Sequence, residues 1–160
     1  MANGGLPPLV PLEGEWQEYE DRLYELFQQS LIRANHTFLG VRIAYRRHPE
    51  AKGKHSAFWH LISEGDTEED RLPDTQRCER ISWPGWIISN AATCDEIIYW
   101  NNVRNGVTNI VLLHTAERYA VVLGQRNGYY LLLSAYPVKS RRFQQMIAES
   151  AACLSDPRKG

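Results

Sequence analysis

Three closely spaced segments rich in β-branched and aromatic residues dominate the second half of the chain. They read NIVLLH (109–114), RYAVVLG (118–124) and YYLLLSAYPV (129–138). Residues of these kinds favour strands. The last two segments are joined by QRNG, in which Asn127-Gly128 is a strong signal for a tight hairpin. The sequence therefore predicts a meander of antiparallel strands, against which the remaining elements must pack.

Amphipathic segments on both sides of this meander predict helices. Apolar residues recur every three or four positions from Glu15 to about Arg33, and again in SRRFQQMIAESAACL (140–154). Asp74 is a suitable N-cap for a helix that runs to Ile81 and is interrupted at Pro84-Gly85, with a further helical turn or two after it. The order of elements predicts an α+β fold, with helices packed against a twisted antiparallel β-sheet of about four strands.

Two further strands are expected upstream, within TFLGVRIAYRR (37–47) and SAFWHLIS (56–63). In the first of them Leu39, Val41, Ile43 and Tyr45 alternate with a partly basic set that includes Arg42 and Arg46. The segment EIIYWNNVRNG (96–106) is compatible with more than one type of element, and Gly106 closes it. Residues 64–74 form an acidic loop.

The length and composition predict a single domain. The chain has 160 residues, of which 43% are hydrophobic and 23% charged, as in ordinary globular proteins. We expect one domain over 15–154, a flexible arm over 1–14 and a polar tail over 155–160. No apolar run approaches the roughly 18 residues of a membrane helix, so no membrane is expected.

The cysteines and the net charge restrict the setting. Cys78, Cys94 and Cys153 form no CxxC pair and leave one thiol over, which favours a reducing, cytoplasmic location. The net charge is −1. A protein that binds nucleic acid through backbone phosphates is usually more basic, so any such contact must come from a local patch.

The known motifs of metal and cofactor sites are missing. The histidines lack HExxH spacing, no glycine-rich phosphate loop follows a strand, and no GxSxG motif is present. We expect no metal and no cofactor. What remains is metal-free acid–base chemistry or no chemistry at all.

Three groups of polar residues within apolar segments are the candidates for such chemistry. His60 stands in FWHLI, where it is either a structural histidine at the edge of the core or a group that moves a proton near neutral pH. Arg77 and Arg80 are three residues apart, and Arg71 precedes them by about a turn. They form surface ion pairs with the acidic residues nearby (Glu68, Glu69, Asp70 and Asp74) or hold a phosphate.

The third group lies on the last predicted strand. Period-two alternation places Ser134 and Tyr136 on one face, together with Tyr130 and Leu132, and an all-apolar set on the face toward the helices. The two hydroxyls are either ordinary strand residues or ligands of a substrate.

These segments follow one another as a FWHLISEG-type histidine, an RCERISW helix and a final YYLLLSAYPV strand. This order resembles that of phage- and toxin-associated nucleases of the barnase–EndoU–colicin–RelE class, called the BECR fold. The resemblance covers roughly Arg42 to Val138. It implies helices ahead of a four-stranded antiparallel sheet and metal-independent cleavage of RNA. In that reaction the 2′-hydroxyl attacks the adjacent phosphorus, and a 2′,3′-cyclic phosphate and a free 5′-hydroxyl result.

Carried over by position, the resemblance assigns a role to each candidate. His60 would be the general base or acid, and Arg80, supported by Arg77 or Arg71, would stabilise the phosphorane. Ser134 and Tyr136 would bind or orient the phosphate. Lys54 and His55 would contact the phosphate or substitute as the acid. The implied partners are an RNA substrate and a cognate inhibitor or antitoxin protein.

The competing hypothesis is a non-catalytic RNA- or protein-binding module. It would use the arginine face together with exposed aromatic residues, for which Trp83, Trp86 and Trp100 are the candidates. Catalysis predicts instead that His60, an arginine of the helix and Ser134 or Tyr136 converge. Dispersal of these side chains over different surfaces would favour the module.

Overall fold

The structure, a computed structural model, describes residues 5–65 and 71–154. Its helices are α1 (Trp16–Phe27), which continues into the wider turn η1 (Gln28–Ile32), α2 (Ser56–Ile62), α3 (Thr75–Glu79), α4 (Trp83–Asn90) and α5 (Ser140–Leu154). Its strands are β1 (Thr37–Phe38), β2 (Val41–Tyr45), β3 (Ser63–Glu64), β4 (Leu72–Pro73), β5 (Ile97–Arg104), β6 (Val107–His114), β7 (Tyr119–Gln125) and β8 (Tyr130–Pro137). The α+β class is confirmed.

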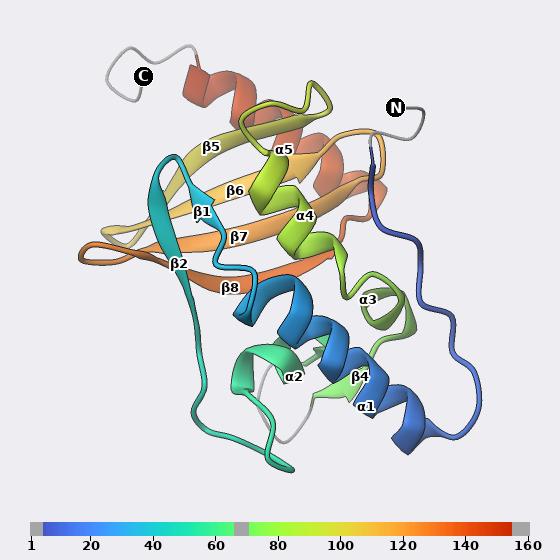
Figure 1. The fold of residues 1–160 in the computed structure, drawn as a ribbon. Coiled ribbons are helices and arrows are strands. Elements are labelled where there is room, and N and C mark those ends of the chain that lie inside the picture. Colours follow the sequence, from blue (N-terminus) through green and yellow to red (C-terminus); the bar gives the residue numbers. More distant parts are fainter. Residues whose placement is uncertain (1–4, 66–70, 155–160) are drawn as a thin grey trace.

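The main sheet differs from the predicted one in size and in direction. Its order in the described part of the chain is β1-β2-β8-β7-β6-β5. Strands β5 to β8 form the expected antiparallel meander, but β2 joins β8 in parallel, with Ile43 opposite Tyr130. The sheet is therefore six-stranded and mixed, and the prediction of about four antiparallel strands was wrong. Figure 1 shows how it curls, so that Phe38 of β1 reaches Tyr99 of β5 with ring centroids 5.1 Å apart.

The segment whose element type was left open is β5, the outer strand of the meander. A two-residue turn, Asn105-Gly106, joins it to β6, and both residues have positive φ angles, 52° and 77°. Asparagine and glycine tolerate that conformation, which a tight antiparallel hairpin requires. The same dipeptide signal that marked the β7–β8 hairpin was therefore present here as well.

The sheet separates two cores (Figure 1). Helices α1 and α4 cover one face, where Leu23, Phe27, Ile87 and Leu112 belong to the larger cluster. Helix α5 covers part of the other face and buries a smaller cluster. We call this second side of the sheet the α5 face. Paired residues of adjacent strands share a face, so the register assigns Trp100, Val111, Val122 and Ser134 to the α5 face.

Residues 5–14, part of the flexible arm expected over 1–14, make backbone contacts with the helices. The Val10 N–H donates to the Glu79 carbonyl at 2.9 Å, and the Trp83 indole donates to the Pro7 carbonyl at 2.8 Å. Its glycines and prolines exclude a helix or a strand but leave the backbone free to bond to neighbours. These contacts place residues 5–14 against α1, α3 and α4. The expected tail (155–160) and residues 66–70 of the expected acidic loop lie outside the described residues, and at the two ends of that loop β3 and β4 pair instead, with Glu64 opposite Leu72.

Residues 56–62 form helix α2, and the strand predicted over 56–63 was wrong. A segment of seven residues, five of them apolar, is too short for its period to distinguish the two elements. In the helix Ala57, Phe58, Leu61 and Ile62 are all buried, whereas strand alternation would have divided them between two faces. Helix α2 packs beside β8, on the same side as β2, whose pairing with β8 ends at Tyr45. The Ala57 N–H of α2 donates to the Arg46 carbonyl at 2.9 Å.

Candidate active site

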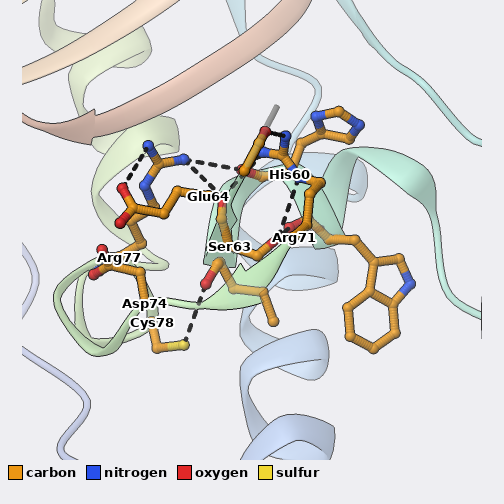
Figure 2. A network of polar contacts seen from close by, with 10 residues as sticks. His60, Ser63, Glu64, Arg71, Asp74, Arg77 and Cys78 are labelled. Carbon is orange, nitrogen blue, oxygen red and sulfur yellow. Dashed lines mark hydrogen bonds and ion pairs between the residues drawn. The ribbon is translucent and has the colours of Figure 1, made fainter. Parts of the chain in front are cut away.

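Two arginines bind the C-terminal end of α2 (Figure 2). Arg71 donates from Nη2 to the carbonyl oxygens of Ser63 at 3.0 Å and His60 at 3.4 Å. Arg77 of α3 donates from Nη1 to the same two oxygens, at 2.8 Å and 3.4 Å. The last carbonyls of a helix lack partners within it and carry partial negative charge, so cations bind there favourably. The two guanidinium groups thereby fix the backbone that carries His60.

Arg71 is engaged on all three of its nitrogens. Besides the two carbonyls, Nε donates to the Ser63 hydroxyl at 3.3 Å and Nη1 to the Gly65 carbonyl at 3.0 Å. The Ser63 hydroxyl in turn donates to the carbonyl of Trp59. These contacts make Arg71 a structural capping residue of α2.

Arg77 connects α2 to strand β8. One of its nitrogens, Nη1, donates to the carbonyls of α2, while Nη2 lies 4.0 Å from the carboxylate of the exposed Glu64. The guanidinium carbon also lies 5.5 Å from the centre of the Tyr136 ring, a cation–π distance. A guanidinium has five N–H donors, so this arrangement leaves donor capacity for an anionic ligand between α3 and β8.

A bulge in β8 determines where its hydroxyl side chains lie. Val122 pairs with Ser134 and the next residue, Leu123, pairs with Leu132, so Leu133 is an extra residue in the strand. The bulge brings both Leu132 and Ala135 into the larger core, although they lie three residues apart. The expected alternation, with Leu132 beside Ser134, was therefore wrong. Ser134 and Tyr136 share the α5 face, where both are half-buried.

The imidazole of His60 extends away from the arginine–carbonyl network, which ends on the His60 carbonyl (Figure 2). His60 is half-buried and follows the buried Ala57 by one helical turn. Because α2 and α3 both pack against β8, His60, Arg77 and Tyr136 belong to one region of the molecule. Arg77 thus contacts the ring of Tyr136 and the main-chain carbonyl of His60.

Lys54 and His55 face α1 instead. Lys54 is 9% exposed, and its ammonium lies 3.2 Å from the carboxylate of Asp21 and 3.8 Å from that of the buried Glu20. His55 shares a hydrogen bond of 2.8 Å between its Nδ1 and the Tyr24 hydroxyl. These contacts hold the loop before α2 against α1 and do not bring either side chain to Tyr136.

The pH dependence of stability tests this structural role of His55. Burial lowers the pKa of the imidazole, and the charge of Arg47 lowers it further. The unfolded chain, with a histidine pKa of about 6.5, binds more protons than the folded one between the two values. Stability is therefore present above about pH 6.5 and is lost as the pH falls through the folded pKa. In urea titrations from pH 7 to 5, we expect His55→Gln to lose less stability than the wild type. An equal loss in both would contradict this role.

Arg80 also lies apart from the other candidates. Its guanidinium lies over the Trp83 ring at 5.1 Å and 3.7 Å from the Glu79 carboxylate, and Nη1 donates to the Gln76 carbonyl at 3.0 Å. Helix α3 ends at Glu79, and Arg80 has left the helical conformation with φ −104° and ψ 22°. The three-residue spacing therefore does not put Arg77 and Arg80 on one helical face.

The aromatic platform expected of a binding module is not formed by the predicted tryptophans. Trp83 and Trp100 are 5% and 3% exposed, and each belongs to a core cluster. The Trp100 indole donates to the Glu149 carboxylate at 2.8 Å, which anchors α5 on β5. Trp86 is half-buried against the larger core.

The thiols and acidic groups of the described residues form no cluster of three or more metal-ligating side chains. Cys78 is buried, its Sγ lies 3.7 Å from the Ile62 carbonyl oxygen, and burial raises the pKa of its thiol to about 12. A thiol with such a pKa stays protonated at neutral pH and is a poor nucleophile. The chemistry available at the α2–β8 region is therefore that of an imidazole, a guanidinium and two hydroxyls.

Comparisons with protein-family models, with curated proteins and with solved structures find no match to this chain. Within residues 5–65 and 71–154, no helix is both long enough and apolar enough to cross a membrane.

Proposed function

We propose that this protein is a metal-independent endoribonuclease. The observation that carries the proposal is the position of Arg77, whose guanidinium contacts both the carbonyl of His60 and the ring of Tyr136. A base or acid, a cation and a hydroxyl side chain are the groups that transesterification at a phosphodiester requires. The resemblance of the sequence to BECR-fold nucleases supports the same reaction class.

In the proposed reaction, His60 removes the proton of the 2′-hydroxyl, and the 2′-oxygen forms a bond to the adjacent phosphorus. Arg77 stabilises the negative charge of the phosphorane. A guanidinium suits this task because its several N–H donors lie in one plane. The bond to the 5′-oxygen then breaks, and that oxygen takes a proton from Tyr136, whose ring lies beside Arg77. Ser134 orients a phosphate oxygen. The products are a 2′,3′-cyclic phosphate and a free 5′-hydroxyl.

Incubation of the purified protein with total RNA and with tRNA in the presence of EDTA tests this function. We expect cleavage that EDTA leaves unchanged, with cyclic phosphate at the new 3′ ends, because side chains supply every role in the reaction. A synthetic RNA with a single 2′-deoxynucleotide at the cut position should resist cleavage there. Intact RNA, or cleavage that EDTA abolishes, would reject the proposal. An intracellular ribonuclease of this kind would act as a toxin or phage-defence effector and would need an inhibitor protein.

A further inference from the structure

A row of three side chains crosses the α5 face at the β7–β8 hairpin. Arg42 lies over the ring of Tyr129, with its guanidinium carbon 4.8 Å from the ring centre. On the other side of Tyr129, the Arg126 N–H donates to the Tyr129 carbonyl at 2.9 Å, which places these two residues opposite each other. Arg42 of β2 and Arg126 of the hairpin loop are therefore both neighbours of one tyrosine, and the Arg126 Nη1 donates to the Gln125 carbonyl at 3.0 Å.

Gly124 makes room for Arg126 on this face. A Cβ atom on Gly124 would lie 2.7 Å from Arg126 Nη1 and 3.1 Å from the Leu133 side chain. Gly124 follows Val122 by two residues, so this missing Cβ would point to the α5 face. The Arg126 guanidinium thus lies over the sheet surface, beside Leu133.

The row lies in line with the proposed reaction centre. From Tyr129 the α5 face of β8 leads past Leu131 and Ser134 to Tyr136 and Arg77. At about 3.3 Å per residue, and with one residue taken up by the bulge, the distance from Tyr129 to Tyr136 is about 20 Å. An extended chain bound along β8 would meet arginine at both ends and hydroxyl groups between them.

The charge of this surface differs from that of the whole molecule, whose net charge is −1. Among the described residues, neither Arg42 nor Arg126 has a carboxylate within 4.0 Å. The Glu149 carboxylate, which α5 brings to the same side of the sheet, accepts hydrogen bonds from Trp100 and Asn102. The row therefore keeps its positive charge and favours an anionic partner.

We propose that Arg42, Tyr129 and Arg126 form a second nucleotide subsite, which binds a phosphate and a base of single-stranded RNA at a distance from the cut. The inference rests on the proposed ribonuclease function. Arginine binds phosphate, and a tyrosine ring is a stacking surface for an unpaired base. The extended α5 face of β8, along which Leu131, Ser134 and Tyr136 are half-buried, fits a single strand. The subsite would give the enzyme a preference for longer single-stranded substrates.

Kinetics on two substrate lengths test the subsite. The double variant Arg42→Gln/Arg126→Gln is compared with Arg22→Gln/Arg33→Gln, a matched control in which Arg22 lies over the Tyr19 ring at 5.4 Å, away from β8. We expect the first pair to raise KM for a 12-nucleotide single strand about five- to tenfold, from two exposed contacts. Its kcat, and its kcat/KM for a dinucleotide, should match those of the control.

The salt dependence provides a second readout. Loss of the phosphate contact should reduce the slope of log affinity against log salt by about 0.7 for a single strand. An equal effect on both substrates, or none on either, would overturn the subsite.

If the wild type cleaves no RNA, fluorescence anisotropy with the same 12-nucleotide strand tests the subsite by itself. Weaker binding by Arg42→Gln/Arg126→Gln than by the control supports it even though the ribonuclease proposal has failed. Equal binding overturns it. Stronger competition by an acidic peptide than by RNA of the same charge also overturns it, because the surface would then serve a protein partner.

Discussion

Replacement of His60 by alanine is expected to lower kcat/KM for RNA cleavage by about 10² to 10⁴, the usual contribution of a general acid or base. Two arginines bind the main-chain carbonyl of His60. One of them, Arg77, also contacts the ring of Tyr136. The loss should appear in a single-turnover assay with excess enzyme. It should also abolish toxicity when the protein is expressed in a bacterial host.

The design of this test separates chemistry from folding. Arg71 and Arg77 bind the carbonyl of His60 and not its ring, so the alanine variant retains both contacts. Its melting temperature, measured beside its rate, shows whether the variant stays folded. His48→Ala, at an exposed position in the preceding loop, is the control and should retain activity. Full activity of a folded His60→Ala protein would reject His60 as the general acid or base and would show that its role is structural.

The parts of the fold that local patterns govern were predicted well. The strands β6, β7 and β8, the terminal helix α5 and the N-cap of α3 each have a signal within a few residues. The Asp74 side chain does accept a hydrogen bond from the Arg77 N–H, at 3.1 Å. Such features depend on neighbours in sequence, which is why period and capping rules find them.

The parts that distant segments govern were missed. The C-terminal end of helix α2 is capped by Arg71 and Arg77, which donate to the Ser63 carbonyl and lie 8 and 14 residues beyond it in sequence. The parallel pairing of β2 with β8 joins segments separated by most of the chain. The bulge at Leu133 shifts the faces of β8 without any glycine or proline to mark it. None of these contacts leaves a local periodicity.

The sequence predicted which residues could form the site but not which of them lie close together. The structure separates those that are neighbours from those that are not. His60, Arg77, Ser134 and Tyr136 remain candidates around β8. Arg126 had not been considered. The sequence did contain a signal for Arg126. A glycine stands two residues before this arginine at a hairpin, and positions two apart in a strand fall on one face.

Arg77 of α3 and Arg80, the residue that follows this helix, offer the sharpest comparison. Replacement of Arg77 by lysine keeps the charge but removes the planar donors that contact the α2 carbonyls and Tyr136. We expect kcat to fall about 10²-fold, as for the loss of one donor to a developing oxyanion. Arg80→Lys should stay within about twofold of the wild type, because the Arg80 guanidinium lies over Trp83 and beside Glu79. Steady-state kinetics on the same RNA would measure both.

A loss of stability could imitate this result, since Arg77 also caps α2, and a hydrogen bond of this kind contributes about 1 kcal/mol. The urea midpoint of each variant therefore accompanies its rate. For Arg77→Ala, added guanidinium ion at concentrations too low to unfold the protein should restore part of kcat, because a free cation can occupy the vacated position beside Tyr136. A purely structural arginine would show recovery of stability without recovery of kcat. If Arg80→Lys proves to be the slower enzyme, the phosphate must lie on the Trp83 side of α3, and the reaction centre proposed at Tyr136 is wrong.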